Sequence, residues 1–101
     1  MLDLTTIDQE TIIARGQYSS VNGALKDAKR KLALQCSEFQ SIAALVLRCM
    51  QPDGDAMPDM EVVRERLTRG RELLAVIDAG ATEIEELALQ RASLKDAAWG
   101  R

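Results

Sequence analysis

The sequence predicts an all-α fold, an antiparallel helical hairpin that is coiled-coil-like and assembles into a helical bundle. Two long stretches carry apolar residues at spacings of three and four, the period of helices that bury one face. A segment rich in proline, glycine and aspartate, residues 51–59, separates them. Aromatic residues are few, at 3%, and alanine, leucine, glutamate and arginine are common, which favours helices over strands.

The length of 101 residues fits one domain, in which residues 1–18 form a short N-terminal helical arm and residues 19–101 form the hairpin. The arm is predicted to hold a helix over residues 7–14. Gly16 and Gly23 weaken a helix, and the serines between them can cap a new one, so we expect a break there. The arm's apolar residues form no narrow stripe, so it either folds back on the hairpin or becomes ordered on a partner.

The first hairpin helix is predicted over residues 19–51 and carries a seam with steps of four and three. Gln35 is the only polar member of the seam. A second apolar line runs beside the seam and widens the face that must be buried, so this helix should contact at least two neighbours. The seam consists of Val21, Leu25, Ala28, Leu32, Gln35, Phe39, Ile42, Val46 and Cys49, and the second line of Ala24, Cys36, Ala43, Leu47 and Met50.

The turn is predicted at residues 52–58, because Pro52 cannot continue a helix and Pro58 or Asp59 suits the first turn of the next one. Its aspartates suggest a calcium loop as an alternative. The spacing of an EF-hand loop is absent, however, so we expect a solvated acidic turn and no metal site.

The second hairpin helix is predicted over residues 59–98. Its apolar stripe continues through Gly80 without losing a step, which favours one continuous helix. A break at residues 79–81 is the alternative, because Thr82 and Glu85 have the spacing of a capping box. The stripe consists of Met60, Val63, Leu67, Gly70, Leu74, Ile77, Ala81 and Ile84, followed by Leu87, Leu94 and Ala98.

Charges support the antiparallel orientation. If the turn centres near residues 54–55, residue i of the first helix lies beside about residue 110 minus i of the second. Basic residues of the first helix then face acidic residues of the second. These are Lys26, Lys29, Arg30 and Lys31 on one side and Asp78, Glu83, Glu85 and Glu86 on the other.

Composition argues against several classes of function. A net charge of −3 and a pI near 4.9 disfavour binding to nucleic acid, which needs a basic face. No apolar run approaches the roughly 18 to 20 residues of a membrane span, and the N-terminus lacks the basic start of a signal peptide, so we expect a cytoplasmic protein. Cys36 and Cys49 lie about 20 Å apart along one helix, too far for a disulfide.

The chain contains no histidine, the commonest general base and a frequent zinc ligand. No phosphate-binding glycine pattern and no pair of carboxylates in an apolar setting is present. We therefore expect no catalytic residues, no cofactor and no small-molecule substrate.

Two groups of residues are candidates for protein interaction. The first is surplus apolar surface. Leu45, Leu47 and Met50 lie near the turn, and Leu34 and Leu89 are further leucines off the main seams. The second is the basic cluster of Arg64, Arg66, Arg69 and Arg71, either a dock for an acidic partner or an ordinary helix surface with interleaved glutamates. Trp99 is expected to anchor the open end of the hairpin to the arm.

These observations predict a non-catalytic helical interaction protein, an assembly factor, adaptor or chaperone-like subunit. Its partner would be a second copy, as a dimer or larger assembly, or a helix of another protein. A dimeric nucleic-acid-associated regulator is the alternative. The layout of arm, helix, Pro-containing turn and helix superficially resembles small helical subunits and co-chaperones of bacterial secretion systems, and phage and regulatory proteins share such hairpins, so it assigns no family.

Overall fold

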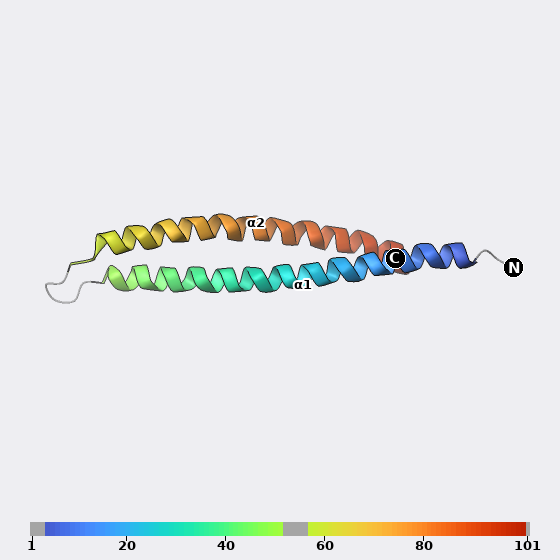
Figure 1. Ribbon diagram of the computed structural model, residues 1–101, viewed down its shortest axis with the longest axis horizontal. Coiled ribbons are helices and arrows are strands. Elements are labelled where there is room, and N and C mark those ends of the chain that lie inside the picture. The colour runs from blue at the N-terminus through green and yellow to red at the C-terminus, as the bar shows by residue number, and fades with distance from the viewer. Residues whose placement is uncertain (1–3, 52–56, 101) are drawn as a thin grey trace. The chain divides into compact units, whose positions relative to one another are not determined.

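The protein folds into two long α-helices, α1 (Leu4–Cys49) and α2 (Met60–Trp99), which Figure 1 shows. The computed structural model describes residues 4–51 and 57–100, with side chains from residue 9 onward, and these ranges contain no strand. The all-α helical hairpin is therefore confirmed. The chain divides into two compact units, the terminal unit (Met1–Arg30 with Thr82–Arg101) and the turn unit (Lys31–Ala81).

In the turn unit, α1 and α2 pack side by side and antiparallel. A Cβ atom added to Gly70 would lie 3.7 Å from Cγ2 of Ile42, and one added to Gly80 would lie 3.5 Å from Cδ1 of Leu32. Residue numbers therefore rise along α1 as they fall along α2. The predicted register placed Ile42 beside residue 68, two positions from its observed neighbour, so orientation and approximate register are both confirmed in this unit.

The terminal unit has the same antiparallel pairing. Nε of Arg15 donates a hydrogen bond to the carbonyl oxygen of Ala98 at 3.2 Å. Nη1 of Arg91 donates to Oδ1 of Asn22 at 2.9 Å, in a half-buried position. Arg91 is half-buried, and its guanidinium therefore has an amide oxygen of α1 as a hydrogen-bond acceptor.

Trp99 joins the end of α2 to the arm, as the sequence predicts. Its ring meets the Tyr18 ring edge to face, with centroids 4.8 Å apart and an interplanar angle of 85°. The guanidinium carbon of Arg15 lies 5.4 Å from the Trp99 ring centroid, within the range of a cation–π contact. The helix ends just beyond, where Gly100 adopts a positive φ of 66° and its amide donates to the carbonyl of Asp96.

The predicted seam of α1 is the buried face of that helix. Every one of its nine residues is buried or half-buried, and Leu25 is only 1% exposed. The same alternation of three and four extends back through Tyr18, Ala14 and Thr11, which are also buried or half-buried. The arm therefore continues the seam of the helix that follows it.

The predicted break between the arm and the hairpin is wrong, because α1 is continuous through Gly16 and Gly23. Each glycine costs a helix about 1 kcal/mol relative to alanine. The contacts of Arg15 and Tyr18 with the end of α2 offset that cost, and the serines between the glycines are exposed mid-helix residues. The first turns of α1 extend past the end of α2 (Figure 1).

The predicted continuity of α2 through Gly80 is correct. Its predicted stripe is correct for only part of its length, because Leu73 is 3% exposed whereas Leu74 is 54% exposed, and Met60 and Leu67 are exposed as well. The face of α2 that contains Gly70 and Gly80 lies against α1, since the missing side chains allow close approach. Leu73 lies on that face, three residues after Gly70, and Leu74 lies beside it.

α2 begins at Met60, one residue later than predicted, and Asp59 precedes it. The side chain of Asp59 accepts a hydrogen bond from the amide of Val62 at 3.3 Å, and its carbonyl accepts one from Val63 at 3.0 Å. This is an N-cap whose negative charge also suits the helix dipole. The predicted turn at residues 52–58 lies largely outside the described residues.

Candidate interaction surface

An apolar groove runs between α1 and α2 in the turn unit. It has a volume of about 360 Å³, and its lining is apolar except for one arginine. We call it the turn groove. Its lining residues are Phe39, Ile42, Ala43, Val46 and Leu47 from α1, and Leu67, Gly70, Arg71 and Leu74 from α2.

Helix geometry explains why the turn groove is open. A Cβ atom added to Gly70 would lie 3.7 Å from side-chain atoms of Phe39 and of Ile42, so these two side chains cover Gly70 and form the floor of the groove. The leucines along the edges of the groove, Leu67 and Leu74 on α2, lie beside the buried face and are about half exposed. The result is a hollow with an apolar floor and apolar rims.

The three apolar residues of the predicted interaction site differ in exposure and in whether they line the turn groove. Leu47 lines the turn groove and is 65% exposed. Leu45 is half-buried and lies outside the groove, because residues two apart on a helix point to different sides. Met50 is exposed just after the end of α1 but is not part of the lining. Of these three residues, Leu47 lines the turn groove and the other two do not.

The four arginines of the predicted basic cluster also differ in whether they line a hollow. Arg71 lines the turn groove, and with Arg64, Leu67 and Thr68 it lines an adjoining hollow of about 300 Å³. Arg66 is exposed and lines neither. The cluster therefore offers two arginines beside the apolar groove.

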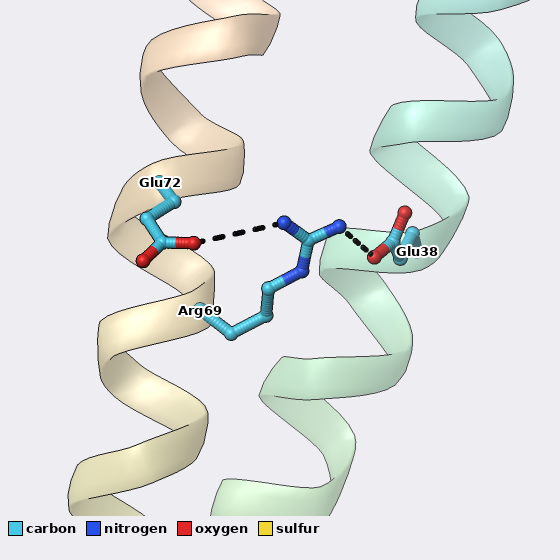
Figure 2. Close-up of polar contacts among 3 residues, drawn as sticks. All are labelled: Glu38, Arg69 and Glu72. Carbon is cyan, nitrogen blue, oxygen red and sulfur yellow. Dashed lines mark hydrogen bonds and ion pairs between the residues drawn. The ribbon is translucent and has the colours of Figure 1, made fainter.

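Arg69 is engaged within the chain, as Figure 2 shows. One terminal guanidinium nitrogen lies 2.8 Å from a carboxylate oxygen of Glu38 on α1, and the other lies 3.7 Å from Glu72 on α2. Arg69 therefore has an acidic neighbour across the hairpin as well as one on its own helix. All three side chains are about half exposed, so the contacts favour the register and contribute little stability.

Arg30 belongs to the basic row that was predicted to face acidic residues of α2. Its guanidinium lies 3.4 Å from the carboxylate of Asp27 on its own helix. In the turn unit, Arg69 and Glu38 supply an ion pair between the helices.

Sequence reasoning missed Leu67, Leu74 and Gly70 as parts of a surface, because it assigned all three to the buried stripe. The available signal was the pair of adjacent leucines, Leu73 and Leu74. Only one of two neighbouring residues can lie at the centre of a helical stripe, so the other must lie beside it.

Among residues 9–51 and 57–100, no group of three or more cysteine, aspartate or glutamate side chains could hold a metal ion. Cys36 and Cys49 are free thiols in half-buried positions. No helix in the described ranges has the length and hydropathy to cross a membrane. Asp53 and Asp55 of the calcium-loop alternative lie outside these ranges.

No protein-family model matches the chain, and neither curated proteins nor solved structures gave a significant match. The function is therefore argued from the surface itself.

Proposed function

We propose that this chain is a non-catalytic helical interaction protein that binds another helix in the turn groove. The observation that supports this proposal is an apolar groove with exposed leucines on both rims. Leu47 forms one rim, and Leu67 and Leu74 form the other. Apolar surface gathered in a hollow is typical of a site that receives apolar side chains.

A helix is the partner whose shape fits best. Two antiparallel helices leave a long furrow between them, and an amphipathic helix can lay its apolar stripe into such a furrow. Burying one leucine-sized side chain contributes about 1.5 to 3 kcal/mol. Several such side chains on each partner can outweigh the cost of association.

The proposal covers an assembly factor, an adaptor and a chaperone-like subunit, acting in the cytoplasm on a second copy or on a helix of another protein. A role in a bacterial secretion system is one setting in which such a protein would act. Nucleic-acid binding remains the alternative, with the basic residues of the 26–31 stretch and of the 64–71 stretch as phosphate contacts. In the second stretch it would rely on Arg64, Arg66 and Arg71, because Arg69 is paired with Glu38. Such binding would weaken steeply with salt.

Substitutions at two leucines of similar exposure test the proposal. Leu47 in the turn groove is 65% exposed, and Leu34 on the same helix is 68% exposed but lies outside the groove. Leu47→Glu should abolish association with a second copy or with a partner captured from native extract, because a charge in an apolar interface is costly. Leu34→Glu should leave that association intact.

Sedimentation measures self-association, quantitative pull-down measures capture, and circular dichroism confirms that both variants keep their helices. Equal loss of association in the two variants would mean that association does not depend on the turn groove. No loss in either variant, for self-association and for capture, would overturn the proposed function.

A further inference from the structure

A second feature of the turn unit lies along the outer edge of the turn groove. Four exposed residues of α2 line a shallow hollow of about 540 Å³. They are Arg71, Leu74, Ala75 and Asp78. Arg71 and Leu74 also line the turn groove, so the two hollows share part of their lining.

The order of these residues is self-complementary. Arg71 and Asp78 lie at equal distances on either side of the midpoint between Leu74 and Ala75. If a second copy of α2 crosses antiparallel with a twofold axis at that midpoint, each Arg71 lies opposite Asp78 of the second copy. At the centre, each large Leu74 side chain meets the small Ala75 of the second copy. An interface between identical chains related by a twofold axis requires this kind of self-complementarity.

We propose that the occupant of this surface is a second copy of the chain, bound antiparallel through α2 with Arg71 of each copy opposite Asp78 of the other. The inference rests on the proposed function, because the second copy would contact Arg71 and Leu74, which also line the turn groove. The second copy lies along the α2 rim of the groove and covers Leu74 on both chains.

Charge favours this occupant over the other candidates. A dock for an acidic partner would be basic throughout, whereas this patch is basic at one end and acidic at the other. A parallel second copy would place Arg71 against Arg71 and Asp78 against Asp78, which repels. Among the described residues, no ion pair involves Arg71. The pairing does not require Asp78 to be free of contacts in its own chain, because a carboxylate accepts several hydrogen bonds.

Charge reversal tests both the partner and the register. The variants are Arg71→Asp, which makes both positions acidic, and Asp78→Arg, which makes both basic. Each variant alone should dimerise on the order of tenfold more weakly than the unmodified chain, because both pairs across the axis become repulsive. An equimolar mixture of the two variants should form heterodimers, since every pair across the axis is again attractive. The chain carrying both substitutions should also recover the dimer.

Sedimentation across micromolar concentrations, repeated at low and high salt, gives the dissociation constants, and circular dichroism confirms helicity. Recovery in the mixture requires the two chains to meet at these positions, so it supports the inference directly. Three results would overturn it. These are an unmodified chain that stays monomeric, single variants that dimerise normally, and a mixture of helical variants that stays monomeric.

Failure here differs from failure of the proposed function. If the unmodified chain is monomeric but Leu47→Glu loses a captured partner that Leu34→Glu retains, the groove binds another protein and only the second copy is excluded. If neither leucine variant changes any association, both proposals fall.

Discussion

Gln35 is the one polar residue in the apolar seam of α1 between Val21 and Cys49, and its neighbour explains how the seam accommodates it. Gln35 is half-buried, and a Cβ atom added to Gly80 would lie 3.7 Å from its Oε1 atom. The missing side chain of Gly80 leaves room for an amide group that a larger residue would crowd. A polar residue at a seam position favours one register over others at some cost in stability. The pair of Gln35 and Gly80 therefore helps fix how α1 and α2 align in the turn unit.

Gly16 is a residue whose replacement should stabilise the protein. It lies in the interior of α1, and no atom lies within 4 Å of a Cβ atom added there. Gly16→Ala should raise the free energy of unfolding by about 0.5 to 1 kcal/mol, because alanine loses less backbone entropy in a helix. Urea unfolding followed by circular dichroism measures the change. Gly100→Ala is the control, and it should lower stability, because the φ of 66° at Gly100 suits glycine alone. A loss of stability in Gly16→Ala would contradict a continuous α1.

The sequence predicted the seam of α1 correctly because each of its residues has a seam partner three or four positions away, and the repeat runs without a missing step from Val21 to Cys49. The same reasoning missed that the seam continues toward the N-terminus, before Val21. Ala14 and Tyr18 continue the pattern, but Gly16 and Gly23 suggested a break. Local helix propensity favoured a break there, and packing against Trp99 favours continuity. The sequence predicted that Trp99 anchors the arm, but that contact joins residues far apart in the chain, and local helix propensity at the two glycines does not include its effect.

On α2, the sequence did not show which of two adjacent leucines is buried. Leu73 and Leu74 both fit a stripe of threes and fours after Gly70, and the choice between them depends on how α2 is rotated against α1. The two seam glycines set that rotation, with Ile42 lying against Gly70. The turn groove could not be predicted for the same reason, because its rim consists of the leucines that this rotation leaves outside the core.

The continuity of α2 at Gly80 can be tested by amide hydrogen exchange. Residues 79–83 lie inside a helix that runs without interruption from Met60 to Trp99, and Leu32 packs over Gly80. Their amides should exchange as slowly as those of the neighbouring turns, since opening them requires breaking interior helical hydrogen bonds. Mass spectrometry of peptides that span these residues measures the rate. Fast exchange confined to residues 79–83 would mean two shorter helices, with Thr82 capping the second.

As a whole, the chain has a thin core. Among the described residues, the buried hydrophobic side chains are Ala14, Leu25, Ile42, Val63, Leu73 and Ala98. Two helices that meet along one seam leave the rest of each helix to solvent, and a domain of this size has a small margin of stability. Any partner that binds only the folded chain adds stability by mass action. The proposed dimer would therefore be part of what keeps the hairpin folded.

A pair of cysteines can show whether α1 packs on α2 of its own chain. The Cγ2 atom of Ile42 lies 3.7 Å from a Cβ atom added to Gly70, so the sulfur of a cysteine at position 42 can approach one at position 70. Ile42→Cys with Gly70→Cys, in a background of Cys36→Ser and Cys49→Ser, should oxidise to a bond within one chain at low protein concentration. Electrophoresis without reductant measures the product. Leu34→Cys with Gly70→Cys is the control and should not form that bond, because its positions are not neighbours along the hairpin. Crosslinks that form only between chains would mean that α1 pairs with α2 of another copy. A bond within each chain, in a protein that still sediments as a dimer, would mean that two closed hairpins associate through their outer faces.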